Sequence, residues 1–454
     1  LKMKKTLLLV TAFLVSAYHQ TQAQTEKAWA SVKDKNFKTA IGASRLSFPI
    51  DFKMFKLDAN VIRQALATAP ERFAARQSGA MISLPNVDGS LERFEMFEAS
   101  NFDPALQAQF PQIRSYVGRG IDDKRAILRM SVDPNGIQSV VFRTDKRNEF
   151  MEPYSEDGTV YAVFNSSRNK SDLPFECYTE DTALVQDLQF QTNDTSRMSN
   201  SGELLTFRLA LSCNGEYAQY HGGTVAGALA GMNATMTRVN GVFEKDLAIH
   251  MNIIANNNLV VYTNAATDPY TSMRQWNGQL QSTLTSVIGV ANYDVGHMFR
   301  RTRGGGKAGC IGCVCVNGIK GRGITSPADG IPAGDNFDID YVAHELGHQF
   351  GGNHTFSNNV EGSGVNVEPG SGSTIMGYAG ITGQDIADHS DDYFVYASIK
   401  QIQDNMVAKP CPIRTPLTNA APVIDAGKDY IIPKTTAFIL TGSGTDAAGD
   451  AIAY

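Results

Sequence analysis

The segment YVAHELGHQFGGNHTF, residues 341–356, holds His344, His348 and His354 within eleven residues, in the pattern HExxHxxGxxH. On an α-helix, His344 and His348 lie about 40° apart around the axis, so both imidazoles face one ion. Gly351 is expected to end the helix, after which the chain turns back and delivers His354 as a third ligand. Three protein nitrogens leave a fourth position for water, which is typical of catalytic rather than structural zinc.

Glu345 follows the first histidine and is rotated about 100° from it on the same helix, so it reaches metal-bound water without being a ligand. Zinc lowers the pKa of bound water from about 16 to about 7. We expect Glu345 to take the proton as that water attacks an amide carbonyl. A second element agrees, because STIMGYAG places Met376 in a tight, Gly-rich turn 22 residues after His354.

Together these motifs resemble the metzincin clan of zinc endopeptidases, and specifically bacterial secreted reprolysin-like enzymes of the adamalysin (M12B) type. The resemblance covers roughly residues 204–412. It implies that the three histidines bind one zinc ion, that the adjacent glutamate is the general base, and that Met376 forms the hydrophobic Met-turn under the metal. Adamalysins usually carry Asp directly after the third histidine, whereas this chain has Thr355, so the clan is better supported than the subfamily.

The resemblance also suggests roles for a tyrosine and a cysteine. Astacins and serralysins have a metal-site tyrosine two residues after the methionine, where Tyr378 stands here. Tyr378 is therefore either a donor to the oxyanion or an ordinary packed tyrosine. Many metzincin propeptides cap zinc with a cysteine, and Cys177 in FECYTED precedes the polar segment 191–203. Cys177 is either such a zymogen switch or a structural thiol.

The six cysteines allow one inference from parity. If all are paired, Cys177 must bond with one of the five in the metzincin-like region, since five is odd. If Cys177 caps zinc, one of those five stays free. Cys310 and Cys313 form a CxxC, but a structural zinc needs four ligands and no second such pair exists. Cys213 and Cys411 lie near the ends of the domain and are candidates for a bridge, although spacing fixes no pairing.

Composition divides the chain into four parts. Residues 1–23, with a basic start, an apolar stretch of 13 residues and a small residue at the cut, predict a signal peptide and hence a secreted, extracellular bacterial protein. Residues 24–200 alternate strand-like runs with turn signals and predict a β-rich prodomain that ends in a linker. Residues 201–412 alternate strands and helices, with a helix expected over residues 224–246 and a strand over residues 259–263, and residues 413–454 read as strands.

These last two parts give the fold class. For residues 201–412 we predict an α/β (α+β) metzincin-like domain with a twisted, mainly parallel sheet and a zinc-binding active-site helix. Residues 413–454 are expected to begin an Ig-like or cadherin-like β-sandwich module, but they are too few to complete it. The sequence is therefore interpreted as part of a longer protein.

Two further segments carry alternatives. Metzincin substrates pair with an edge strand before the zinc helix, and the candidate here is GGGKAGCIGCVCV, residues 304–316, whose glycines allow a foreign backbone to approach. The alternative is a flexible loop.

The acidic segment DHSDDYF, residues 388–394, has oxygen ligands suited to Ca²⁺, but a role of Ser390 or Asp391 in capping the next helix explains these acidic residues more simply. Calcium is thus unsupported.

We predict a secreted zinc-dependent metalloendopeptidase, made as a zymogen, that cleaves internal bonds of extended protein or peptide substrates. Two alternatives keep the same ligands: a secreted adhesion or binding protein with a non-catalytic zinc site, and a zinc hydrolase of a non-peptide amide. The formal charge of −6 excludes a nucleic-acid binder, which would show a basic face. No stretch after residue 23 approaches 18 uncharged apolar residues, so no membrane span is expected in the mature chain.

Overall fold

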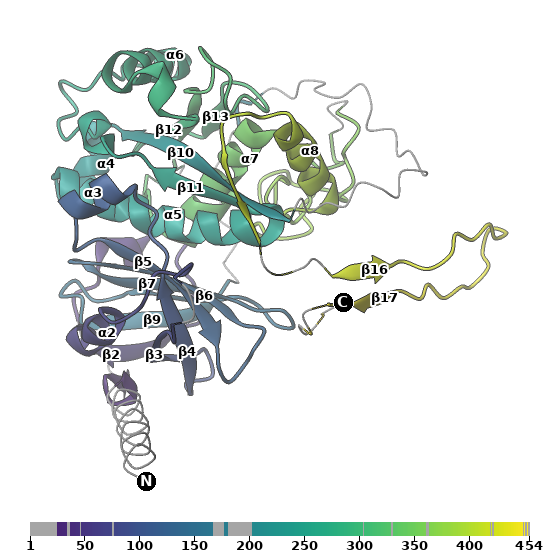
Figure 1. Cartoon of the computed structure of the whole chain (residues 1–454), viewed down its shortest axis with the longest axis horizontal. Coiled ribbons are helices and arrows are strands. Elements are labelled where there is room, and N and C mark those ends of the chain that lie inside the picture. Colours follow the sequence, from purple (N-terminus) through teal and green to yellow (C-terminus); the bar gives the residue numbers. More distant parts are fainter. Residues whose placement is uncertain are drawn as a thin grey trace, which may run out of the picture.

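A computed structural model describes residues 25–33, 37–45, 47–74, 77–166, 177–179, 202–302, 304–327, 330–359, 363–417, 419, 422–447, 449 and 452. The predicted signal peptide, residues 1–23, lies outside this part of the chain, as does most of the predicted linker. Two sheets dominate the molecule, and the long helix α5 (Val225–Leu247) lies between them (Figure 1).

The described residues from 25 to 166, here called the N-terminal unit, form an antiparallel sheet of nine strands in the order β1-β2-β9-β8-β7-β6-β5-β4-β3. Its strands are β1 (Trp29–Val32), β2 (Lys53–Leu57), β3 (Ala80–Pro85), β4 (Leu91–Glu98), β5 (Arg114–Gly120), β6 (Ile127–Asp133), β7 (Gly136–Phe142), β8 (Glu149–Pro153) and β9 (Val160–Asn165). Its helices are η1 (Ile41–Ser44), α2 (Ala59–Leu66) and α3 (Pro104–Gln109). The alternation is visible in β4, where Phe94 and Met96 are buried and Arg93 and Glu95 are less so, as a sheet with one covered face requires.

The described residues from 202 to 417, here called the α/β unit, form a second sheet in the order β11-β10-β12-β14-β13, with β15 paired to β10. Its strands are β10 (Glu203–Cys213), β11 (Ile249–Ile253), β12 (Val295–Phe299), β13 (Gly306–Ala308), β14 (Gly323–Thr325) and β15 (Ile413–Pro416). Strands β11, β10, β12 and β14 run parallel, whereas β13 and β15 are antiparallel to their neighbours. The sheet is therefore mixed and mainly parallel, in agreement with the α/β prediction.

The helices of the α/β unit include those predicted, and one of them overlaps a predicted strand. They are α4 (Gly215–Tyr220), α5, η2 (Asn257–Val260), α6 (Met273–Thr283), η3 (Leu284–Ile288), η4 (Val290–Asn292), η5 (Asn336–Ala343), α7 (His344–Phe350) and α8 (Tyr396–Val407). The run LVVYT, residues 259–263, reads as a strand but lies partly in η2. The Asn257 side chain bonds both the N–H and the C=O of Leu211, at 2.8 Å each, and so takes the place of a neighbouring strand there.

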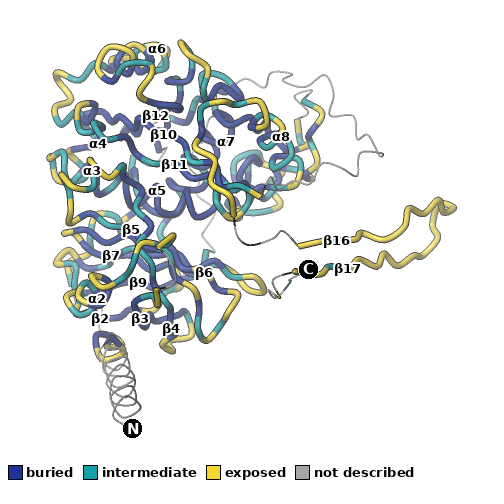
Figure 2. Tube along the Cα trace, viewed as in Figure 1, coloured by how far each residue is buried: buried dark blue, intermediate teal, exposed yellow. Residues whose placement is uncertain are grey.

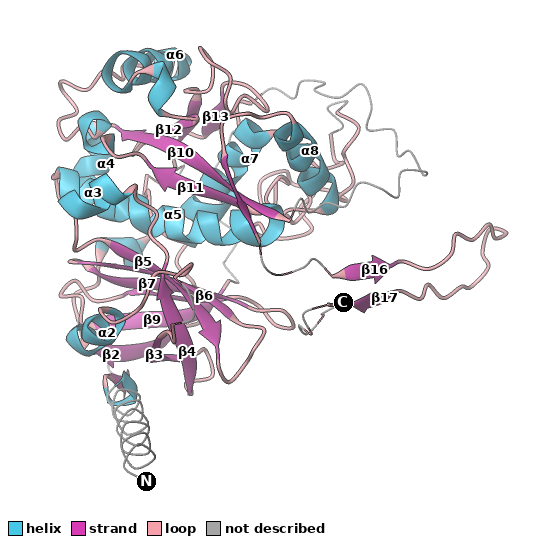
Figure 3. Cartoon of the chain, in the orientation of Figure 1, coloured by secondary structure: helices cyan, strands magenta, loops and turns pink. Residues whose placement is uncertain are grey.

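Helix α5 is buried along most of its length because both units pack on it (Figure 2). Phe142, Phe150 and Phe164 of the N-terminal unit share one apolar core with Val239 and Phe243 of α5. Figure 3 shows the strands of the two units on opposite sides of this helix. Among the described helices, none is both long and apolar enough to cross a bilayer.

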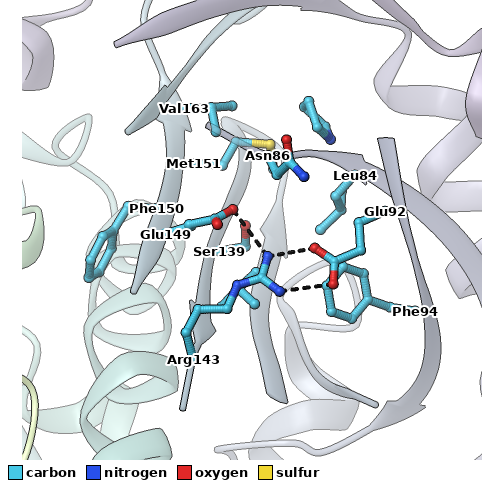
Figure 4. Close-up of a pocket in the computed structure, with 12 residues that line it drawn as sticks. Leu84, Asn86, Glu92, Phe94, Ser139, Arg143, Glu149, Phe150, Met151 and Val163 are labelled. Carbon is cyan, nitrogen blue, oxygen red and sulfur yellow. Dashed lines mark hydrogen bonds and ion pairs between the residues drawn. The ribbon is translucent and has the colours of Figure 1, made fainter. Parts of the chain in front are cut away.

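A buried charge cluster lies inside the N-terminal sheet, beside a small cavity (Figure 4). Arg143 is only 1% exposed and donates to Glu92 Oε1 at 2.9 Å and to Glu149 Oε2 at 3.1 Å. Burial opposes the charge, but the two carboxylates more than offset it and raise the pKa of Arg143. The charged side chains of this cavity therefore bond with one another, and the cluster joins β4 and β8 to the residue that follows β7.

The chain after the α/β unit forms a two-stranded hairpin, β16 (Val423–Asp425) and β17 (Ser443–Thr445), which projects from the molecule (Figure 1). Its described residues are almost all exposed. The predicted β-sandwich module therefore stays a prediction.

Two disulfides correct one expectation from the sequence. Cys310 bonds Cys313, and Cys315 bonds Cys411. Cys213 is a buried free thiol, so the bridge considered between Cys213 and Cys411 is wrong. The reason is positional, because Cys213 ends β10 inside the core, whereas Cys411 directly precedes β15.

Candidate metal centre

Three histidine nitrogens converge at the predicted zinc site. His344 and His348 lie on α7 with their Nε2 atoms 3.1 Å apart, and Nε2 of His354 lies 3.1 Å from that of His348. All three side chains are at most 1% exposed. Tetrahedral zinc with bonds of about 2.0 to 2.1 Å to nitrogen places its ligands about 3.3 Å apart. The three imidazoles therefore fit zinc closely.

Backbone carbonyls orient two of these imidazoles. Nδ1 of His344 lies 2.6 Å from the carbonyl oxygen of Ile375, and Nδ1 of His348 lies 2.7 Å from that of Gly352. A carbonyl only accepts, so Nδ1 carries the hydrogen and each Nε2 lone pair faces the centre. Burial, together with the two neighbouring imidazoles, holds the pKa of His348 well below its ordinary value. The ligand is therefore neutral, as metal binding requires.

Two glycines shape this part of the site, and Gly351 ends the helix as predicted. Gly351 ends α7 with φ of 125°, a conformation that favours glycine, and its N–H donates to the Gly347 carbonyl at 3.0 Å. The chain then returns and brings His354 to the metal site. A Cβ at Gly347 would lie 2.5 Å from Sδ of Met376, so the glycine makes room for the fully buried methionine against the helix. Met376 thus lies where the Met-turn was expected.

Glu345 is fully buried beside the histidines and is bonded to the edge strand β13. Its Oε2 accepts from the Ala308 N–H at 2.8 Å and from Thr179 Oγ1 at 3.2 Å. A Cβ at Gly306 would lie 1.8 Å from Glu345 Oε1, so only glycine leaves space for this carboxylate. Burial raises the pKa of Glu345 to about 7, although hydrogen bonds from Cys177 and Ala308 oppose the shift. A carboxyl group with such a pKa suits proton transfer near neutral pH.

Cys177 lies at the fourth corner of the site. Its Sγ is 3.7 Å from Nε2 of His348, and the four potential ligand atoms of Cys177 and the three histidines all lie within 4.8 Å of one another. A tetrahedral zinc would place a sulfur and a nitrogen ligand about 3.6 Å apart. Burial raises the pKa of the Cys177 thiol, and the charge of Glu345 raises it further. The only groups of three or more suitable side chains in the described residues belong to this cluster.

The residues after Cys177 lie along the edge of the α/β sheet. Cys177 forms a parallel bridge with Gly306, and the Tyr178 N–H donates to the Gly306 carbonyl at 2.9 Å. Thr179 Oγ1 accepts from the Ala308 N–H at 2.8 Å. Residues 177–179 therefore extend along β13, the edge strand at which a substrate was expected.

That edge strand is shorter than predicted. Of residues 304–316, only Gly306–Ala308 form β13, and the following turn is closed by the disulfide between Cys310 and Cys313.

Tyr378 packs against two rings near the metal site, with its ring centroid 4.6 Å from that of His354 and 4.4 Å from that of Phe356. These contacts place Tyr378 beside the metal site, and its role as an oxyanion donor stays a prediction.

Glu368 is a site residue that sequence reasoning missed. This buried carboxylate accepts from the N–H groups of Ser373 and Thr374 at 2.9 Å each, from the Thr374 hydroxyl at 2.7 Å, and from the Thr355 hydroxyl. It therefore joins the segment after His354 to the loop that carries the Met-turn. The sequence held one signal of this role. Thr355 stands where adamalysins carry an Asp carboxylate, and in this chain a carboxylate from another loop, Glu368, bonds Thr355 instead.

The acidic segment 388–394 has a different role from the one expected. The N-cap position of α8 is Val395 and no side chain bonds there, so neither Ser390 nor Asp391 caps the helix. Instead the Ser390 N–H donates to Asp340 Oδ1 at 2.7 Å, and the Asp391 N–H donates to the Ser373 carbonyl at 2.6 Å. The segment therefore links the Met-turn loop to η5 through hydrogen bonds to both.

A helix with two of the three converging histidines and a buried glutamate, a glycine turn to the third histidine, and a methionine packed against the helix form a metzincin-like site. Residues 204–407 match the sequence model of metallo-peptidase family M12B, reprolysin-like. This part of the chain is a reprolysin-like metallopeptidase domain. None of the curated proteins matches the chain.

Proposed function

We propose that this protein is a secreted zinc-dependent metalloendopeptidase that is made as a zymogen. The observation that carries the proposal is the convergence of three buried imidazoles, with Nε2 of His348 3.1 Å from Nε2 of both His344 and His354, beside the buried carboxylate of Glu345. A structural zinc site needs no such base. The match to an M12B metallopeptidase over residues 204–407 supports the same reading.

The residues of the chain divide the chemistry among them. His344, His348 and His354 would hold the zinc ion, which would supply a Lewis acid to the site. Glu345 takes the proton of the attacking water and passes it to the leaving amine. The Ala308 N–H holds one carboxylate oxygen of Glu345, so the other is left to face the reaction.

Residues 177–179 explain how the zymogen is kept inactive. The Cys177 sulfur occupies the corner of the site that water needs, and the backbone of these residues runs along β13 where an extended substrate would pair. Thr179 also bonds the Glu345 carboxylate. One short segment thus obstructs the metal, the base and the substrate strand together, and it must leave before peptides can bind.

Purified protein spanning residues 24–454 tests the catalytic proposal. After removal of the N-terminal unit it should hold one zinc per chain and cleave a denatured protein, and a chelator should abolish the cleavage. Glu345→Gln should reduce cleavage by 10²-fold or more, roughly the contribution of a general base. Asp404→Asn, which breaks a surface pair with Lys400, is the control and should not change it. Full zinc occupancy without any cleavage would point to the binding-protein alternative.

Cys177→Ala tests the zymogen proposal separately. The unprocessed variant should cleave peptides while the unprocessed parent stays inactive, because the fourth corner of the site is then open. Cys213→Ala is a matched control, since this thiol is also buried and free but contacts the Tyr262 carbonyl at 3.9 Å and is not part of the histidine cluster. Equal inactivity of the Cys177→Ala and parent zymogens would mean that Cys177 is a structural thiol. Cleavage of small amides but not of extended peptides would favour the non-peptide hydrolase.

A further inference from the structure

The N-terminal unit and residues 177–179, which follow it in the chain, together cover both edges of the α/β sheet. At one edge the Ile253 N–H of β11 donates to the Asn101 carbonyl at 2.7 Å, and the Asp103 N–H donates to the Ile253 carbonyl at 2.8 Å. At the other edge residues 177–179 lie along β13. Both contacts are made by residues that precede the segment 180–201 in the chain. A cut in that segment therefore breaks none of them.

A buried amide cluster strengthens the first contact. The Asn101 side chain donates to Asn233 Oδ1 at 3.0 Å and to Thr237 Oγ1 at 2.8 Å, and it accepts from Asn240 Nδ2 at 3.0 Å. These four side chains are at most 4% exposed, and the last three lie on α5. Separation of the units would break the three hydrogen bonds of the Asn101 side chain, each of which contributes modestly to association.

A buried charge chain joins the N-terminal unit to the helix that leads into the metal site. Glu152 of β8 pairs with Arg45 at 2.8 Å and with Arg238 of α5 at 2.9 Å, and Arg238 also pairs with Asp338 of η5 at 2.8 Å. These side chains are at most 6% exposed. Because η5 continues directly into α7, the chain of charges ends six residues before the ligand His344.

A second charge cluster lies nearer the C-terminal end of α5. Glu244 pairs with Arg72 of the N-terminal unit at 2.8 Å, with Arg129 of β6, and with His250 at 2.6 Å. Burial alone would raise the pKa of Glu244, but Arg129 and the bond to His250 hold it well below its ordinary value. Breaking one partner of such a buried pair is strongly destabilising, because the remaining charge stays uncompensated.

From these contacts we infer that the α5 and β11 face of the α/β unit is a protein-binding surface whose partner is the N-terminal unit as a separate chain. After cleavage within residues 180–201 the two fragments remain one particle, with Cys177 still at the metal site. The latency of that particle rests on the proposed function, whereas the association does not. Activation then takes two steps, the cut and the later loss or destruction of the N-terminal fragment.

The test replaces part of residues 191–200 with the recognition sequence of a specific protease and cuts the protein spanning residues 24–454 to completion. Size-exclusion chromatography under native conditions should show both fragments in one peak at the size of the uncut chain. Separate elution of the two fragments would overturn the inference. Peptide cleavage by the co-eluting complex at the rate of the dissociated α/β fragment would overturn its latency.

Charge reversal at the interface sharpens the test. Arg72→Glu with Arg129→Glu places two acidic groups against Glu244 and should raise the dissociation constant of the cut complex by at least about thirtyfold. Arg93→Glu is the control, because Arg93 pairs with Asp122 within the N-terminal unit and is 39% exposed. Thermal melting of the uncut variants shows whether each still folds. Where the double variant fails to fold, exchange of a labelled wild-type N-terminal fragment into the cut complex decides, since rapid exchange would overturn stable association.

The two proposals fail in different ways. Association is read by elution and exchange, neither of which needs zinc chemistry. If the dissociated α/β fragment binds zinc and cleaves nothing, the peptidase proposal fails while co-elution still supports the binding surface. If the fragments separate and the α/β fragment cleaves peptides, the binding surface fails and the peptidase proposal stands.

Discussion

At the scale of single residues, the site depends on a carboxylate that is not a ligand. Glu368 bonds the backbone N–H groups of Ser373 and Thr374, the two residues that precede Ile375, whose carbonyl orients His344. It also holds Thr355, the neighbour of His354. Glu368 is thus a positioning residue, because it fixes the loops on both sides of the zinc site without touching the metal.

Glu368→Gln should therefore weaken zinc binding by about 10- to 100-fold, the usual effect of losing an outer-shell partner. The glutamine keeps one acceptor but turns an amide donor toward groups that already donate. Competition with a chelator measures the affinity. Thr355→Asp added to Glu368→Gln should recover part of the loss, because a carboxylate returns to the same pair of loops. No recovery, together with a loss of thermal stability only, would indicate a merely structural role.

At the scale of elements, the zinc helix is bonded to the middle of the sheet. His297 of β12 donates from Nδ1 to Gln349 Oε1 at 2.7 Å and accepts at Nε2 from the Thr325 hydroxyl at 2.8 Å. Gln349 also donates to the Gly296 carbonyl at 2.9 Å. Burial lowers the pKa of His297 to about 4, although the bond to Gln349 opposes the shift. The folded protein therefore needs this imidazole neutral.

The sign of the resulting pH dependence follows from that pKa. Above about pH 6.5 the imidazole is neutral in both states, so its contribution is fully present. As the pH falls from 6.5 to 4, His297 binds a proton in the unfolded chain but not in the folded chain. The free energy of unfolding therefore falls by up to about 3 kcal/mol. His297→Gln should flatten the fall of Tm over this range, as thermal melts at several pH values would show. An unchanged slope would mean that the imidazole does not stay neutral.

The sequence allowed prediction of features that depend on neighbours in the chain. The spacing of the three histidines, Gly351 and Met376 depends on helix geometry and one turn, and α5 lies within a residue or so of its predicted bounds. Features set by distant contacts were not predictable. Asn257 displaced a strand through a bond to Leu211, 46 residues away. The pairing of Cys315 with Cys411 and the place of Glu368 likewise depend on how loops meet after folding.

At the scale of the whole molecule, the C-terminal part of the described chain contains one segment that stabilises the fold and one that does not. Strand β15 pairs with β10, and Cys411 just before it bonds Cys315 across 96 residues. The hairpin of β16 and β17 pairs only with itself, and almost all of its described residues are exposed. The boundary between the two segments lies near residue 417.

Two variants separate these contributions. Deletion of residues 418–454 should leave the Tm of the zymogen unchanged, because the hairpin packs on neither unit. Cys315→Ala with Cys411→Ala opens a long loop and should lower the unfolding free energy by as much as about 4 to 5 kcal/mol, or the Tm by roughly 10 °C. Cys310→Ala with Cys313→Ala is the matched control, since a loop of four residues gives only about 2 kcal/mol on the same relation. Equal losses for the two disulfides would contradict the assignment of β15 and Cys411 to the α/β unit, and a large loss on deletion would show that the hairpin contributes to its stability.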